Sequence, residues 1–162
     1  MPSGASARNA PSSPQPARTA RTYGSVTAAN PHGWECFADP RQQQRLRRLA
    51  AAGVDAVGLI TEVYQAIPCN LSAGQARALA RLAPPSLQTV LVTTAEDVDE
   101  ACRLAEHVGA NVLQLHGFNP PADVAAICAR TGARVVKTLH VQGERLAEPA
   151  EAIGEYLAAG VS

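Results

Sequence analysis

The sequence has no excess of charge of either sign. Its 162 residues include 14 lysine and arginine side chains and 14 aspartate and glutamate side chains, so the formal net charge is zero. A protein that holds nucleic acid through its phosphates needs a basic excess to displace counterions. The balanced charge therefore argues against nucleic acid as a partner.

Long apolar runs are also missing. A helix needs about 20 consecutive apolar residues to cross a bilayer, and the longest run here, which begins at Ala50, is interrupted by Asp55. The sequence thus predicts no membrane-spanning segment. Aromatic residues make up only 4% of the chain, against 46% hydrophobic residues in all. The core is therefore expected to consist of aliphatic side chains.

Cysteines are few and widely separated. None of them forms a Cys-x-x-Cys pair or a cluster with histidine; they are Cys36, Cys69, Cys102 and Cys128. This spacing argues against a structural zinc site, and we expect no metal. A chain of this length does not depend on disulfides for its stability. Free thiols in a reducing, cytoplasmic compartment are the expectation.

Residues 1–33 differ in composition from the rest of the chain. They contain five prolines and no acidic residue. Such a segment buries too little apolar area to offset an ordering entropy of roughly 1–2 kcal/mol per residue. We therefore expect a disordered tail over residues 1–33 and one domain over residues 34–162.

From Asp39 onward, helical and strand patterns alternate. Amphipathic helices are expected over residues 40–52, 72–83, 97–108, 121–130 and 148–159. Buried strands are expected over residues 54–60, 89–93, 111–115 and 134–139, with a further, less clear strand near 25–37. This alternation is typical of βαβ units in a parallel sheet. No Gly-x-Gly-x-x-Gly follows a strand, so a dinucleotide site has no support. An open doubly wound sheet and part of an eight-stranded barrel both fit.

The strand at residues 111–115 carries the clearest candidate site. Gln114 and His116 are two residues apart, so their side chains leave the strand on the same side. Gly117 then allows a tight turn at the carboxyl end of the strand, where parallel α/β proteins bind their ligands. His116 can donate, accept or carry charge near neutral pH, although a single histidine also fits a structural role. His140, after the next strand, is a weaker candidate for the same face.

This segment, Leu113-Gln114-Leu115-His116-Gly117, resembles the V/L-Q-L-H-G motif of phosphoribosylanthranilate isomerase, a (β/α)₈ enzyme of tryptophan biosynthesis. Residues 50–140 resemble that family in order and spacing; the matching segments are Ala52–Gly58, Leu71-Ser72 with Gln75-Ala76, Pro84-Pro85 with Gln88–Val92, and Val135–Lys137. The resemblance implies an α/β fold of the (β/α)₈ TIM-barrel type, incomplete at about five βα units and preceded by the disordered tail.

The resemblance also implies a reaction. The family carries out the Amadori rearrangement of N-(5-phosphoribosyl)anthranilate to 1-(2-carboxyphenylamino)-1-deoxyribulose 5-phosphate. A general acid protonates the ribose ring oxygen, and a general base then removes the proton on C2. No metal or organic cofactor takes part. By the resemblance, Gln114 and His116 contact this phosphosugar–anthranilate substrate.

Several positions depart from the family pattern. Cys36 is the only candidate for the catalytic base, but it lacks the lysine two residues before it and the glycine after it. Cys69 stands where the family has a substrate-contacting arginine, and a thiol cannot replace the two-pronged contact of a guanidinium. Phe118 stands where the family often has an acidic residue. The acidic residue of the family's sixth strand and its phosphate loops are expected after the position of Ser162.

Three functions therefore stay open. The chain is the isomerase; or it is an inactive remnant or fragment of that barrel which needs a complementing chain; or it is another phosphosugar-binding barrel enzyme. The last would require acidic or phosphate-binding residues at strand ends, which the sequence does not offer. Unpaired edges of an incomplete barrel would also favour self-association.

Overall fold

The computed structural model describes residues 40–64, 70–140 and 147–162, with the backbone alone for residues 40 and 147–151. Helices and strands alternate in the order α1 (Pro40–Ala51), β1 (Ala56–Ile60), α2 (Ala73–Leu82), β2 (Gln88–Thr93), α3 (Val98–Val108), β3 (Val112–Leu115), α4 (Pro121–Arg130), β4 (Arg134–Lys137) and α5 (Ala147–Ala158). The expected tail, the expected strand near residues 25–37, and Cys36 lie outside the described residues. The division at residue 33 stays a prediction.

Local sequence signals explain where the helices begin and end. Ser72 caps α2, and its side chain and that of Gln75 bond each other's backbone N–H groups in a capping box. Asp97 caps α3 by accepting from the N–H of Glu100. At the other end of α3, Gly109 takes the left-handed conformation (φ 68°) that glycine adopts without strain. These termini match the expected ones to within a residue or two.

The four strands form one parallel sheet in the order β1-β2-β3-β4. Its two faces differ in burial. One row across the sheet, Leu59, Leu91, Leu113 and Val135, is fully or almost fully buried. The next row, which points to the opposite face, is only partly buried; it consists of Ile60, Val92, Gln114 and Val136. We call the first the helix-facing side and the second the concave side.

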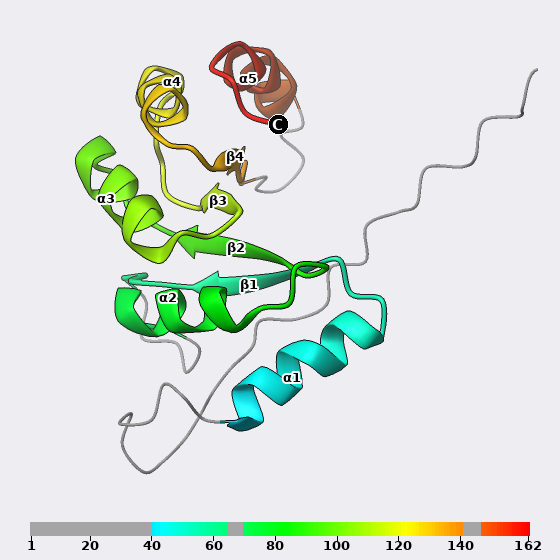
Figure 1. Cartoon of the computed structure of the whole chain (residues 1–162). Coiled ribbons are helices and arrows are strands. Elements are labelled where there is room, and N and C mark those ends of the chain that lie inside the picture. Colours follow the sequence, from blue (N-terminus) through cyan, green and yellow to red (C-terminus); the bar gives the residue numbers. More distant parts are fainter. Residues whose placement is uncertain (1–39, 65–69, 141–146) are drawn as a thin grey trace, which may run out of the picture.

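The helices follow one another around the outside of the sheet (Figure 1). Contacts run from α1 to α2, α2 to α3, α3 to α4 and α4 to α5. The strand order has no reversal, whereas a doubly wound sheet reverses at a switch point and carries helices on both faces. Consecutive strands with a single outer layer of helices are the wall of a (β/α) barrel. The structure therefore confirms the expected incomplete barrel-type α/β fold.

None of the helices in the described part of the chain combines the length and the hydrophobicity that a membrane crossing requires.

Candidate functional site

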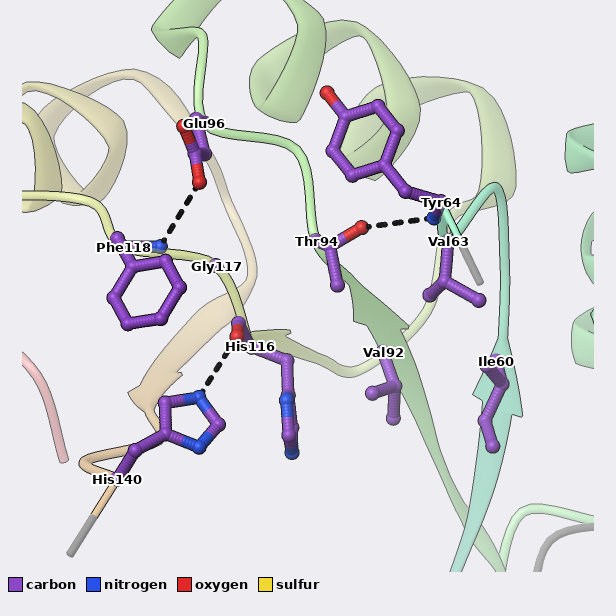
Figure 2. A pocket seen from close by; sticks show the side chains of 10 residues that line it. All are labelled: Ile60, Val63, Tyr64, Val92, Thr94, Glu96, His116, Gly117, Phe118 and His140. Atoms are coloured by element: carbon purple, nitrogen blue, oxygen red, sulfur yellow. Dashed lines mark hydrogen bonds between the residues drawn. The ribbon is translucent and has the colours of Figure 1, made fainter. Parts of the chain in front are cut away.

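A cavity of about 400 Å³ lies at the carboxyl ends of the first three strands (Figure 2). Ile60 ends β1, Val92 and Thr94 come from the end of β2, and His116 follows β3. The remaining lining residues are Val63, Tyr64, Glu96, Gly117, Phe118 and His140. This edge of the sheet is where barrel enzymes bind their ligands, because the βα loops meet there.

His116 lies in this cavity, as the sequence predicts for a ligand-binding residue. Its backbone N–H donates to the carbonyl of Thr93 at 2.8 Å, which continues the pairing of β3 with β2. Its own carbonyl lies 3.1 Å from Nε2 of His140. Because a carbonyl oxygen only accepts, Nε2 of His140 carries the proton of this bond. The two imidazole rings meet edge to face, with centroids 4.8 Å apart.

Gln114, the second predicted substrate contact, is bonded to the end of β4, and its contact with the substrate stays a prediction. It lies on the concave side, two residues before His116, but it does not line the cavity. Its Nε2 donates to the hydroxyl of Thr138 at 3.0 Å, just after β4. The side-chain amide of Gln114 therefore connects β3 to the end of β4. His116 is the side chain of the Leu-Gln-Leu-His-Gly segment that lines the cavity.

Gly117 is required for a reason other than the expected tight turn. A Cβ added at this position would lie 2.7 Å from the carbonyl oxygen of Thr94 and 3.1 Å from Cγ of Glu96. Side-chain atoms do not approach backbone so closely without displacing it. Glycine is thus needed because the loops after β2 and β3 touch here.

The loop after β3 is tied down on both sides of Phe118. Nζ of Lys137 donates to the carbonyl of Gly117 at 2.6 Å and to that of Thr138 at 2.8 Å. The first of these bonds holds the loop against the end of β4. Burial lowers the pKa of the Lys137 ammonium from its ordinary value.

Asn119 holds the other side of the same loop. Its fully buried Nδ2 donates to the carbonyls of Ala95 and Glu96, at 2.9 and 3.1 Å, and its own carbonyl accepts from the hydroxyl of Tyr156 on α5 at 2.9 Å. The backbone N–H of Phe118 faces Oε1 of Glu96 at 3.5 Å. The loops after β2 and β3 therefore form one connected unit.

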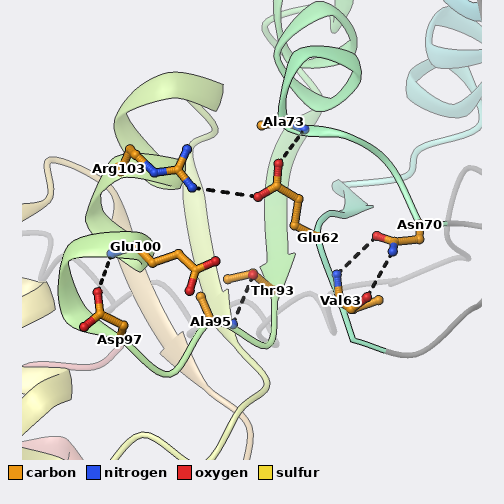
Figure 3. Close-up of polar contacts among 9 residues, drawn as sticks. All are labelled: Glu62, Val63, Asn70, Ala73, Thr93, Ala95, Asp97, Glu100 and Arg103. Atoms are coloured by element: carbon orange, nitrogen blue, oxygen red, sulfur yellow. Dashed lines mark hydrogen bonds and ion pairs between the residues drawn. The ribbon is translucent and has the colours of Figure 1, made fainter.

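The loop after β1 is stabilised by polar side chains of its own (Figure 3). Asn70 bonds both backbone groups of Val63, with its Oδ1 accepting at 3.2 Å and its Nδ2 donating at 3.0 Å. Glu62 has a positive φ of 51°. Its carboxylate accepts from the N–H of Ala73 at the start of α2 and lies 3.9 Å from the guanidinium of Arg103. Val63 is therefore fixed where it lines the cavity.

Some residues of the cavity were missed by the sequence patterns, and two predicted positions lie outside the described residues. Thr94 and Glu96 follow the end of β2 directly, so the strand-end rule that selected His116 would have selected them too. Phe118 was noted only as a departure from the family. Cys36, the predicted base, and Cys69 lie outside the described residues. Among residues 40–64, 70–140 and 147–162, no three metal-ligating side chains come together.

Similar proteins share both this sequence and this fold, although no family model matches the chain. It is 43% identical over 86 residues to an N-(5'-phosphoribosyl)anthranilate isomerase of Natronomonas pharaonis, a match of 53% of this chain and 41% of that protein. To the isomerase of Haloferax volcanii it is 45% identical over 91 residues, which is 56% of this chain and 41% of the relative. The chain thus spans less than half the length of these curated relatives.

Solved structures give the same picture. The crystal structure of TrpF from Jonesia denitrificans is 33% identical, with a TM-score of 0.52 over 61% of this chain and 45% of that one. A phosphoribosyl anthranilate isomerase in complex with reduced 1-(o-carboxyphenylamino)-1-deoxyribulose 5-phosphate is 27% identical, with a TM-score of 0.57 over 74% of this chain and 57% of the other. In sequence and in fold, the chain is therefore similar to part of a phosphoribosylanthranilate isomerase, as the Leu-Gln-Leu-His-Gly segment indicated.

Proposed function

We propose that this chain supplies one wall of the substrate pocket of a phosphoribosylanthranilate isomerase. The reaction is the Amadori rearrangement of N-(5-phosphoribosyl)anthranilate, in tryptophan biosynthesis and in the cytoplasm. One observation carries the proposal: the segment that resembles the family motif places His116 in a cavity at the carboxyl ends of the strands. The identity to isomerases of 43% and 45% supports it.

The rearrangement needs proton transfer on two sides of the sugar, and the cavity has groups that take part in such chemistry. His116 contacts the substrate through its imidazole ring, and Gln114 keeps β3 and β4 in place through Thr138. Glu96 and His140 bring a carboxylate and a second imidazole to the same cavity. Cys36 remains the proposed base for the C2 proton. No metal or cofactor enters this scheme.

Two exposed surfaces favour a barrel that is completed by further βα units. The concave side leaves Ile60, Val92 and Val136 partly exposed, although most of the barrel's interior should be dry. On α5, Ile153 and Leu157 are 47% and 59% exposed and lie four residues apart, hence on one helix face. We propose that further βα units cover these surfaces and complete the active site. An inactive fragment is the alternative, and no observation favours a different phosphosugar enzyme.

The direct test is growth of a tryptophan-requiring strain that lacks the isomerase. The chain is expressed alone, and then together with a fragment of the Haloferax volcanii isomerase that carries the remaining βα units. We expect growth without tryptophan in the second case, and its loss on H116A at an unchanged protein level. H107A is the matched control, because His107 is an exposed histidine of α3 outside the cavity.

Each result has a clear meaning. Growth with the chain alone would contradict the need for completing units. No growth with both fragments, although they copurify, would contradict the proposed activity and favour the inactive fragment. Growth that H116A leaves unchanged would remove His116 from the site.

A further inference from the structure

Phe118 is a large apolar side chain that is exposed at the rim of the cavity. Its side chain is 78% exposed, although it lines the cavity and lies beside buried Asn119. Single exposed apolar side chains are common on protein surfaces, but a large one at the rim of a concave site is a typical ligand contact. Tyr64, across the cavity, is 77% exposed. Two open aromatic rings thus border the same cavity.

The loop holds the backbone of Phe118 in place from both sides. Its two neighbours are held by buried or partly buried hydrogen bonds, Gly117 through Lys137 and Asn119 through the carbonyls of Ala95 and Glu96. All of these bonds leave the phenyl group free, because they use backbone atoms of the loop or the side chain of Asn119. The structure therefore fixes the backbone at this position and presents the ring, as preorganised binding sites do.

The ring also continues a row of aromatic side chains. Phe118 and His140 have centroids 5.6 Å apart at an interplanar angle of 42°, and His140 meets His116 edge to face at 4.8 Å. Figure 2 shows these three rings on one side of the cavity, with Ile60, Val63 and Tyr64 on the other. An aromatic wall faces a largely aliphatic one, with Val92 between them.

We propose that Phe118, together with His140, binds the aryl ring of the substrate and so determines the specificity for an aromatic amine. The inference rests on the proposed isomerase function, which supplies an aryl-amine substrate. A flat ring gains tilted or edge-to-face contacts with Phe118 and His140 and apolar contacts with the opposite wall. The imidazole of His116, at the inner end of the row, can donate a hydrogen bond to the carboxylate of that ring.

The test compares three probes on the purified chain by NMR titration, which detects weak binding. They are reduced 1-(o-carboxyphenylamino)-1-deoxyribulose 5-phosphate, anthranilate, and ribose 5-phosphate, which has no ring. We expect F118A to weaken the two aryl probes about 2- to 10-fold, the range of aromatic pair energies, and to leave ribose 5-phosphate unchanged. F118L, which keeps apolar volume without a flat ring, should lie in between. H107A, which removes an exposed ring of α3 outside the cavity, is the control and should change none of them.

The imidazole protons of His140 give a second readout, since a bound aryl ring shifts them in the unmodified protein. Equal binding of both aryl probes by F118A and the unmodified chain would overturn the inference and leave the isomerase proposal intact. Binding of anthranilate that depends on Phe118, without binding of the reduced product analogue, would support the aryl site and contradict the isomerase proposal. An unmodified chain that binds neither aryl probe would overturn the inference.

Discussion

The two sides of the sheet come from alternate residues of the same strands, yet they differ in almost every respect. On the helix-facing side, Leu59, Leu91 and Leu113 are 0% exposed beneath the outer helices. On the concave side, Ile60 and Val92 remain partly exposed and border the cavity. The outer layer is thus a finished core, whereas the concave side offers binding surface and little packing. On the proposed function, one face of the sheet stabilises the fold and the opposite face binds the substrate.

The difference in packing between the two sides can be measured at Leu59 and Ile60, which are adjacent in β1 and have isomeric side chains. L59A should lower the free energy of unfolding by about 3 kcal/mol, because it opens a cavity under the helices. I60A deletes the same number of atoms from a partly exposed position and should cost about 1 kcal/mol. Urea unfolding followed by circular dichroism measures both values.

Similar losses for the two variants would show that the concave side is as well packed as the helix-facing one. The comparison can be repeated with a complementing fragment bound, which should cover Ile60. The loss in free energy of unfolding caused by I60A should then increase, while the loss caused by L59A should change little. If L59A shows no unfolding transition at all while I60A still does, the helix-facing side is again the better packed of the two.

The second largest effect on stability is expected from G117A, at the contact between the loops after β2 and β3. G117A places a Cβ 2.7 Å from the Thr94 carbonyl, so the loops after β2 and β3 must separate. Overpacking of this kind costs about 1–3 kcal/mol, and the separation should also weaken ligand binding. G132A is the control, because an added Cβ there meets nothing within 4 Å. Thermal unfolding of the two variants measures the difference, and equal melting temperatures would show that the loops are not in firm contact.

Sequence patterns predicted the elements that short-range chemistry determines. Ser72 and Asp97 cap helices within three residues of their partners, and Gly53 and Gly109 take the positive φ values that end a helix. The apolar runs gave the strands, because strands of a parallel sheet are buried by long apolar stretches. Choosing a barrel over a doubly wound sheet needed the family resemblance, since both have the same local pattern.

Contacts between distant residues were beyond these patterns. Gln114 bonds Thr138, 24 residues later, and Asn119 bonds carbonyls 24 and 23 residues earlier. Neither partner can be read from spacing along one strand. The motif pointed to both Gln114 and His116 as ligand contacts, and only His116 lies in the cavity. From the sequence, Phe118 is only a departure from a position that is often acidic in the family. Its place at the rim of the cavity follows from the hydrogen bonds of Gly117 and Asn119, which join residues distant in sequence.

The smallest expected effect concerns the thiols of the helices that cover the helix-facing side. Burial raises the pKa of Cys128 on α4 above its ordinary value of about 9. Burial also raises the pKa of Cys102 on α3, although the nearby Arg130 guanidinium partly opposes it. In a background with C36S and C69S, iodoacetamide should therefore modify both cysteines with midpoints above pH 9.

The sign for stability follows from the same shifts. The folded chain holds these protons more tightly than the unfolded chain does, so the thiols stabilise the fold below pH 9 and lose that contribution as the pH rises through the raised pKa values. R130Q removes the opposing charge and should move the midpoint of Cys102 further upward without changing that of Cys128. A midpoint at or below 9 for either thiol would mean that the outer helices open to solvent and that the helix-facing side is not the finished core described above.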